Sequence, residues 1–261
     1  KRQVYEAPLD ELRAHPQLSF VLAAIESVAS ELPSGLQLII NSEISNQVGL
    51  GSSAAVTSAV VAALAKFIGS DCSPETLFDT AFSVVRKVQQ GRGSGADLAA
   101  SIYGGMLAYN VSPRRVQRLD GSPKIVLHYV GYKMKTPDVI QYVEELAKPH
   151  PALFEQIYRL MGEVTNTALG AILNRDWQDL GLLMNQYAGL MDALGVCDHN
   201  LADLQYKLRA VEGVFGTKIS GSGLGDSVIT LGVDSTADLG YRMIPVSISS
   251  RGLEIEDKRH G

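Results

Sequence analysis

The first half of the chain carries helical patterns of hydrophobic and polar residues. Apolar residues recur with the helical period from Pro16 to Leu32 and again through the Ala- and Val-rich stretch Ser53–Phe67, which predicts two helices. A third helix is predicted after Ser73, because Pro74 then takes the first helical position and Glu75 lies in the first turn. The first half is therefore expected to be rich in helices.

Short runs of β-branched and aromatic residues predict strands around these helices. Leu36–Ser42 is a compact candidate, since it is rich in residues that favour strands. The other candidates in this part of the chain are 106–110, 115–119 and 124–130. We therefore expect an N-terminal α/β unit over residues 1–130.

The pattern changes from Thr136, where helical stretches follow one another up to about residue 213. Strand candidates come after them, at 214–220, 227–233, 243–249 and 252–256. Helices followed by strands indicate an α+β unit, which we place at residues 131–261. We expect its long helices to pack against the C-terminal sheet, and the alternative is that they form a partner-binding face.

Composition narrows the class of protein. The chain has 261 residues, 46% of them hydrophobic, and a net charge of -5, which argues against a broad nucleic-acid surface. The two cysteines and five histidines lack the spacing of a zinc site or a disulfide framework. No run reaches the ~20 apolar residues of a membrane span, and the start does not have the pattern of a signal peptide. These features predict a soluble cytoplasmic protein that binds neither membrane nor nucleic acid.

The loop Gly49–Ala55, with the sequence GLGSSAA, carries the first candidate chemistry. Its glycines let backbone amides approach a ligand, and the helix that follows directs its unpaired N–H groups and positive dipole end at the same place. A triphosphate would fit there, and a serine hydroxyl could bind magnesium. The alternative is a tight turn in which Ser52 or Ser53 caps the helix.

Two further glycine-rich segments follow. In Gly91–Gly105, Asp97 stands at the end of a Gly-Ser loop, where it could accept a proton from an alcohol during phosphoryl transfer or act only as a first-turn carboxylate favoured by the helix dipole. In Gly216–Ser227, alternating glycines lie between two predicted strands. They form either a loop that closes on a ligand or a plain connection between strands.

Taken together and in this order, GLGSSAA, GSGAD and KISGSGLGD resemble the motifs of the GHMP family of small-molecule kinases. The resemblance covers Leu36 to about Gly232, and within the family the stretch 179–196 is most similar to mevalonate kinases. It implies an α+β, two-domain GHMP kinase fold with an N-terminal α/β domain that contains a left-handed crossover and a C-terminal ferredoxin-like domain. It also implies an active site between the two domains.

The resemblance assigns roles to individual positions. It places the phosphates of ATP on two loops, whose matching residues are Gly49, Leu50, Gly51, Ser52, Ser53 and Ala54 in the first and Gly221, Ser222, Gly223 and Gly225 in the second. Ser53 matches the serine that binds Mg²⁺, and Asp97 matches the aspartate that acts as base. Ser94, Gly95 and Thr136 match positions near the substrate.

The chain departs from the family pattern in several places. No counterpart of the family's N-terminal lysine motif precedes KRQVYEAPLDEL, so we expect the authentic chain to begin earlier. Where mevalonate kinases carry a magnesium-binding glutamate, this chain has Arg86, Lys87 and Gln89, charges that suit a phosphorylated substrate or simply a solvated helix end. Asp226 replaces a family glycine, and we expect it to point away from the phosphates or to pair with Lys218.

The resemblance implies in-line transfer of the γ-phosphoryl group of ATP to a small substrate that has a hydroxyl and a carboxylate. Mevalonate is the first expectation, and phosphomevalonate or the substrate of another family member is the alternative. Two rivals of different class are a decarboxylase of the diphosphomevalonate type and a nucleotide-binding protein without catalysis. A homodimer is expected from the resemblance alone.

Overall fold

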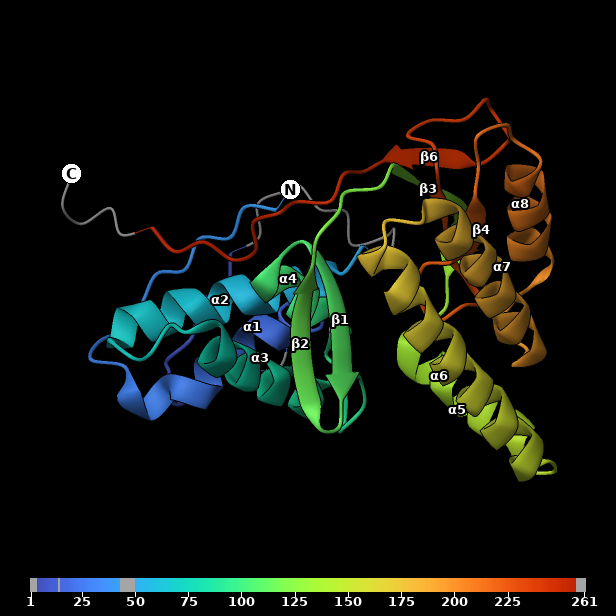
Figure 1. Ribbon diagram of the computed structural model, residues 1–261. Helices are drawn as coiled ribbons and strands as arrows, with labels where there is room; N and C mark the ends of the chain where they lie inside the picture. The colour runs from blue at the N-terminus through green and yellow to red at the C-terminus, as the bar shows by residue number, and fades with distance from the viewer. Residues whose placement is uncertain (1–3, 14, 43–49, 257–261) are drawn as a thin grey trace. The chain divides into compact units, whose positions relative to one another are not determined.

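The computed structural model describes residues 4–13, 15–42 and 50–256 (Figure 1). Its helices and strands, in chain order, are α1 (Ser19–Val28), the 3-10 helix η1 (Ala29–Glu31), α2 (Ser52–Ile68), α3 (Pro74–Val88), α4 (Ala96–Tyr103), β1 (Met106–Val111), β2 (Arg114–Leu119), β3 (Ile125–Lys133), α5 (Thr136–Ala147), α6 (Pro151–Leu173), α7 (Trp177–Ala193), α8 (His199–Arg209), β4 (Gly216–Ile219), β5 (Gly225–Leu231) and β6 (Arg242–Pro245).

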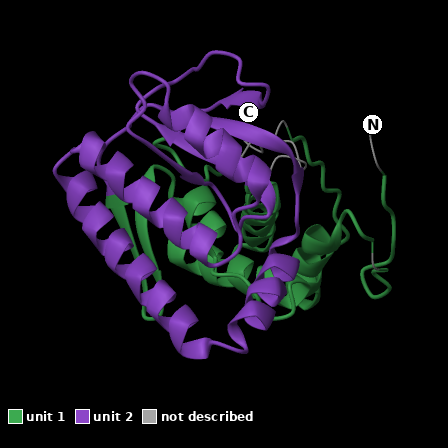
Figure 2. Ribbon diagram, turned by 90° about the vertical axis from the view of Figure 1, so that its right-hand side faces the viewer, with its two compact units in different colours: residues 1–44, 51–118, 249–261 green, residues 45–50, 119–248 purple. Residues whose placement is uncertain are grey.

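The described residues form two compact units (Figure 2). Unit 1 comprises the residues up to 42, residues 51–118 and those from 249 onward, whereas unit 2 comprises Leu50 and residues 119–248. Besides the placement of Leu50, the predicted division into 1–130 and 131–261 differs from these units in two ways. The chain passes from unit 1 to unit 2 after Arg118 rather than after residue 130, and it returns to unit 1 at Ser249.

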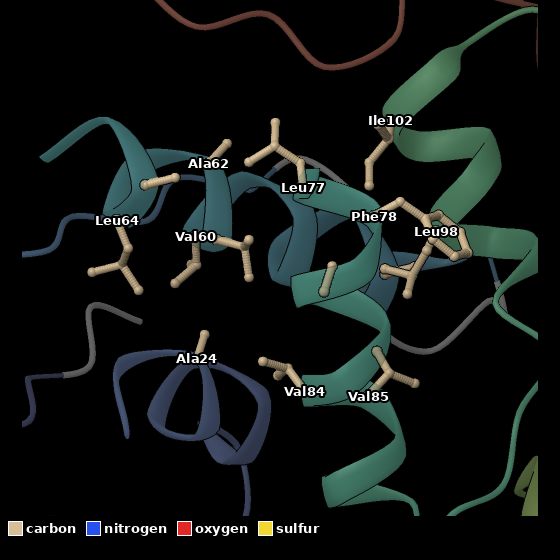
Figure 3. Close-up of a cluster of buried hydrophobic side chains, with 14 of the residues drawn as sticks. Ala24, Val60, Ala62, Leu64, Leu77, Phe78, Val84, Val85, Leu98 and Ile102 are labelled. Carbon is tan, nitrogen blue, oxygen red and sulfur yellow. The ribbon is translucent and has the colours of Figure 1, made fainter. Parts of the chain in front are cut away.

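The core of unit 1 is built by the four helices α1 to α4. Figure 3 shows side chains from all four converging, among them Ala24 from α1, Val60 from α2, Leu77 from α3 and Leu98 from α4. Each of these side chains is almost completely buried. The run of Ala and Val that predicted α2 is what lets it pack closely against α1, α3 and α4.

The start of α3 is formed as the sequence predicts. Ser73 is the N-cap and its Oγ accepts a hydrogen bond from the backbone N–H of Thr76, while Pro74 takes the first helical position. A serine cap satisfies one of the amides that a helix start leaves unpaired. The prediction of this helix is therefore confirmed.

The strands of unit 1 differ from the prediction. Among the described residues, unit 1 holds the two-stranded sheet β1–β2, and the left-handed crossover stays a prediction. Residues 36–42, expected as a strand, have no strand assignment. Leu36 and Leu38 pack on the helical core while Ile39 is exposed, so the segment has the alternation of a strand without a described neighbour to complete a ladder.

The last described segment lies along unit 1. Its predicted strand, 252–256, is not formed. The amide of Leu253 instead donates to the carbonyl of Ile102 over 3.1 Å, and the amide of Gly105 donates to the carbonyl of Ser249 over 2.7 Å. Gly252 passes so close to Ile102 that a Cβ there would lie 2.1 Å from its carbonyl oxygen. This contact with the end of α4 is why the C-terminal segment belongs to unit 1.

Unit 2 is a four-stranded antiparallel sheet with helices. The strand order is β4-β5-β3-β6, so β3, which the sequence analysis assigned to the first unit, is a central strand of the second. The four helices α5 to α8 all lie in the connection from β3 to β4. Helix α7 packs on β4, and α8 packs on β4 and β5. The expected packing of α7 against the sheet is therefore confirmed, whereas α6 packs on α7.

The contact of α7 with β4 depends on two glycines. A Cβ on Gly216 would lie 1.9 Å from the carbonyl oxygen of Gly181, and a Cβ on Gly181 would lie 2.4 Å from the backbone of Phe215. The helix and the strand can approach this closely only because both positions lack side chains. No described helix in either unit is long and apolar enough to cross a membrane.

Candidate active site

The first functional element is the N-terminus of α2. Gly51 is its N-cap, in the left-handed conformation with φ of 68°, and it supplies no side-chain cap. The first amide to bond back along the helix is that of Ala55, which donates to the carbonyl of Gly51 over 3.0 Å. The amides of Ser52, Ser53 and Ala54 therefore precede the first intrahelical hydrogen bond, at the positive end of a helix of 17 residues.

The expected alternative for this loop was a serine cap, and the structure contradicts it. Ser52 and Ser53 are inside the helix, and the cap is Gly51. Ser53 is exposed, Ser52 and Leu50 are half-buried, and Ala54 is buried in the core. The hydroxyl of Ser53 is thus available to a ligand at the helix start. Gly49 lies outside the described residues.

The second functional element is the N-terminus of α4, which lies beside the first. Gly95 is the N-cap, again left-handed with φ of 81°, and Asp97 is the acidic residue of the first turn. A Cβ on Gly51 would lie 3.8 Å from Cβ of Asp97 and 3.9 Å from its Cγ. The exposed carboxylate that the sequence predicts as a base is therefore adjacent to the start of α2, within unit 1.

Aromatic side chains support the loop before Asp97. A Cβ on Gly95 would lie 3.0 Å from the rings of Phe78 and Phe82, and these two rings are stacked with centroids 5.6 Å apart. The hydroxyl of Tyr109 donates to the carbonyl of Ser94 over 2.6 Å, and partial burial raises the pKa of that hydroxyl. Glycine is needed at position 95 by its φ and by these rings.

Arg114 connects this aromatic group to a carboxylate of α3. Arg114 donates to both carboxylate oxygens of Asp79, and its guanidinium lies 4.9 Å from the centroid of the Phe78 ring. These hydrogen bonds hold the pKa of the Asp79 carboxyl below its usual range and raise that of Arg114. The pair connects α3 to β2 next to the Phe78 ring.

The charges at the end of α3 have structural partners. Lys87 pairs with Glu26 of α1 over 2.8 Å, with both side chains well exposed. The guanidinium of Arg86 lies 5.7 Å from the centroid of the Phe82 ring. These contacts favour the interpretation of Arg86 and Lys87 as a helix end over the interpretation as a site for a phosphorylated substrate.

The third motif lies in unit 2, between β4 and β5. Gly223 has φ of 92°, and a Cβ there would lie 2.4 Å from the carbonyl oxygen of Val196. Gly225 has φ of 110°, and a Cβ there would lie 2.7 Å from the carbonyl oxygen of Tyr132. Gly221 is exposed and Ser222 is half-buried. The segment is packed against β3 and the loop before α8, so Gly223 and Gly225 are sterically required.

The partner of Asp226 differs from the expected one. Its Oδ2 lies 3.1 Å from Nζ of Lys133 at the end of β3. Lys218 instead donates to the carbonyl of Ile219 over 2.6 Å and lies 5.4 Å from the centroid of the Tyr187 ring. Burial lowers the pKa of Lys218 to about 8. The expected pairing with Lys218 is wrong because Lys218 is opposite Ile229 in the ladder of β4 and β5, three residues away from Asp226, a feature that spacing along the chain does not reveal.

The remaining candidate, Thr136, is the exposed first residue of α5 in unit 2. The structure thus brings together the start of α2, Ser94, Gly95 and Asp97 in unit 1, whereas Thr136 and the third motif belong to unit 2. The described residues contain no group of three or more His, Cys, Asp or Glu able to hold a metal. Magnesium in phosphate sites needs only one or two protein oxygens besides those of the phosphates, so Ser53 and Asp97 have suitable chemistry.

Sequence reasoning missed the supporting residues Tyr109, Phe78, Arg114 and Lys133. Tyr109 lies on a predicted strand, Arg114 just before one and Lys133 shortly after one, and none of them has a motif around it. The one signal available was Asp226 itself, a carboxylate placed among glycines, which needs a cation nearby if it is buried.

Comparison with known proteins matches two family profiles. Residues 19–105 match the GHMP kinases N terminal domain, and residues 168–245 match the GHMP kinases C terminal domain. The mevalonate kinase of Thermococcus sibiricus is 33% identical in an alignment 259 residues long that covers 94% of this chain and 77% of that protein. The mevalonate kinase of Saccharolobus solfataricus is 30% identical over 231 residues, 88% of this chain and 72% of that protein.

Solved structures share the fold. L. major mevalonate kinase in complex with R-mevalonate has a TM-score of 0.66 at 25% identity and covers 82% of this chain, which spans 68% of that chain. Streptococcus pneumoniae phosphomevalonate kinase in complex with phosphomevalonate and AMPPNP has a TM-score of 0.68 at 16% identity. The match covers 89% of this chain and 78% of that chain. At 16% identity, the similarity to phosphomevalonate kinase shows only that the fold is shared.

The hydrogen bond from Tyr109 to Ser94 gives a testable prediction. Tyr109→Phe removes one hydrogen bond and should lower the free energy of unfolding by about 1 kcal/mol. The amides of residues 91–97 should also exchange with solvent faster, because the loop loses its anchor on β1. Tyr158→Phe, on the exposed side of α6, is the control and should change neither quantity. Unchanged exchange in the Tyr109 variant would show that the hydroxyl does not hold this loop.

Proposed function

The chain belongs to the GHMP kinase family, and from that premise we propose that it transfers the γ-phosphoryl group of ATP to mevalonate, which gives 5-phosphomevalonate. The choice of mevalonate is supported by the two relatives named mevalonate kinase, which are 30% and 33% identical to this chain over most of its length. The observation that supports the proposed active site is that the N-terminus of α2 lies next to Asp97. A group that binds phosphate and a group that accepts a proton lie side by side in one unit.

The first turn of α2 is the proposed binding site for the phosphates of ATP. The amides of Ser52, Ser53 and Ala54 precede the first intrahelical hydrogen bond, and Gly51 offers no side chain to occupy them. Phosphate oxygens accept such amides well, and the positive end of the helix dipole adds to the attraction. The glycines of the third motif, Gly221 and Gly223, are the second group of residues proposed for ATP binding.

The exposed hydroxyl of Ser53 is the proposed protein ligand of magnesium. Mg²⁺ keeps several waters and is usually bound by one or two protein oxygens together with substrate phosphates. When bound, it would neutralise charge on the phosphates during transfer. Ser53 lies in the same turn as the amides that hold the phosphates, so one helix start serves both purposes.

Asp97 orients the substrate hydroxyl and accepts its proton. In phosphoryl transfer a protein contributes mainly by positioning the reactants and by stabilising charge. A carboxylate within hydrogen-bond reach of the alcohol positions the hydroxyl group. Ser94 and Gly95 shape the same loop, since Ser94 is held through its carbonyl and Gly95 against two rings. Ser94, Gly95 and Thr136 are the residues we propose for substrate contacts.

Phosphomevalonate is the alternative substrate, and the structure adds no specific support for it. The cations that suggested it are Arg86 and Lys87, of which Lys87 pairs with Glu26 and Arg86 lies over Phe82. The homodimer and the cytoplasmic location remain predictions that rest on the resemblance and on composition.

The proposal is tested by an assay of ADP release with Mg²⁺ and ATP, offered mevalonate, phosphomevalonate, homoserine and galactose in parallel. We expect steady ADP production with mevalonate and no carbon dioxide release. Turnover of phosphomevalonate alone would replace the substrate, and carbon dioxide from diphosphomevalonate would assign the decarboxylase class. Binding of Mg·ATP with no turnover of any alcohol would contradict a catalytic role.

Asp97→Asn tests the base directly. The change keeps the size of the side chain and removes its charge, so kcat should fall about 10²- to 10⁴-fold while the affinity for Mg·ATP stays within a factor of about two. Asp138→Asn is the matched control, because Asp138 is also an exposed first-turn carboxylate, in α5. The control should retain full turnover. An Asp97→Asn variant with undiminished kcat would remove Asp97 from the mechanism.

A further inference from the structure

Asp226 is a carboxylate in an unusual setting. Its side chain is 4% exposed, and Lys133, whose side chain is 34% exposed, provides the one ion pair seen for it among the described residues. Its second oxygen, Oδ1, is buried without a hydrogen-bond partner in the part of the chain that the structure describes. A buried carboxylate is costly unless it is paired. The pair with Lys133 is therefore what permits a charge at this place.

The backbone at Asp226 gives no reason for a carboxylate. Its φ is 76°, in the left-handed region that glycine occupies freely and other residues occupy at a cost. Aspartate tolerates this region better than most residues, but a glycine there would be less strained. What aspartate adds is the contact made by its side chain.

That side chain lies against the glycine segment. A Cβ on Gly221 would lie 3.2 Å from Oδ2 of Asp226, so the carboxylate packs directly beside the backbone of Gly221. The other member of the pair, Lys133, is opposite Gly225 in the ladder of β3 and β5, and a Cβ on Gly225 would lie 3.0 Å from Cα of Lys133. The ion pair thus contacts both ends of the segment from Gly221 to Gly225.

The ladder is irregular where the pair forms. The register of β3 and β5 shifts between Tyr129 and Lys133, and irregular pairing leaves a segment less determined by ladder hydrogen bonds. The amide of Ser220 donates to the carbonyl of Ser227 over 2.8 Å, and the amide of Leu224 donates to Val196 over 2.8 Å. The ion pair adds a side-chain connection from this segment to β3.

From these contacts we infer that Asp226 and Lys133 are positioning residues that hold the Gly221–Gly225 segment in the conformation that accepts nucleotide phosphate. The inference rests on the proposed function, which assigns ATP binding to this segment. Lys133 has a second effect, because it neutralises a carboxylate that would otherwise repel a phosphate. The two residues are therefore not equivalent, and loss of the lysine alone is the more harmful change.

The test uses Asp226→Asn, Lys133→Met and the double variant, with kcat and the KM for ATP measured for each. Asp226→Asn should raise the KM for ATP roughly tenfold, and Lys133→Met should raise it further because it leaves a buried carboxylate unpaired beside the phosphates. The double variant should have a lower KM for ATP than Lys133→Met alone. In all three, KM should change more than kcat.

A second ion pair, just outside the same two strands, provides the control. Lys124 and Asp234 also lie 3.1 Å apart, but both side chains are 67% exposed, and they flank the opposite end of the β3–β5 pair. Asp234→Asn should leave the KM for ATP unchanged. An equal change in KM from both aspartate variants would overturn the inference, since it would show a general effect of charge.

Hydrogen exchange separates this inference from the proposed function. The amides of residues 220–225 should exchange faster in Asp226→Asn than in the unaltered protein, and the affinity for Mg·ADP should fall, whether or not any alcohol is phosphorylated. If Asp226→Asn is poorly folded, Asp226→Gly serves instead, because it removes the carboxylate and relieves the backbone. Unchanged exchange at 220–225 together with unchanged Mg·ADP affinity would overturn the inference, whereas absent turnover with these effects present would contradict only the kinase assignment.

Discussion

The structure of the candidate site depends on two helices that begin at left-handed glycines. Gly51 precedes α2 with φ of 68°, and Gly95 precedes α4 with φ of 81°. Three other described helices are capped by side chains, α3 by Ser73, α7 by Asp176 and α8 by Asp198, whereas α1, α5 and α6 have no side-chain cap. A side-chain cap would occupy amides that a phosphate needs. Glycine leaves those amides available and lets the two helix starts approach each other.

The elements around these glycines act as supports. Tyr109 and the ring pair Phe78 and Phe82 hold the loop before α4, and Arg114 connects that aromatic group to Asp79. In unit 2, Lys133 and Asp226 have the same relation to the third glycine motif. In both units the residues proposed to contact ATP or substrate lie in glycine-rich loops or in the first turns of helices. Small residues position themselves poorly, so neighbours on strands and helices have to hold these segments in place.

Much of this was predictable from local patterns, because local chemistry determines it. Helix α2 begins and ends within one residue of the predicted bounds, and α3 begins at its predicted cap. The three glycine motifs carry the resemblance to GHMP kinases that the family profiles and the relatives confirm, and the two-domain fold of that family is confirmed with it.

What could not be predicted depends on pairing across the chain. Residues 36–42 have the composition of a strand, but a strand also needs a neighbour for its ladder, and composition does not supply that information. Strand β3 was correctly predicted as a strand and assigned to the wrong unit, since its partners β5 and β6 come about a hundred residues later. The pairing of Asp226 with Lys133 depends on that same ladder, so it could not be predicted from the spacing of residues along the chain either.

The claim on which the account depends is that the first-turn amides of α2 are ligands of the nucleotide phosphates. Hydrogen exchange at Ser52, Ser53 and Ala54, measured with and without saturating Mg·ADP, tests it most directly. The account predicts strong protection of these amides on binding, because they precede the first intrahelical hydrogen bond and exchange readily in the free protein. Saturating nucleotide that leaves their exchange unchanged would contradict the account and would place the phosphates elsewhere.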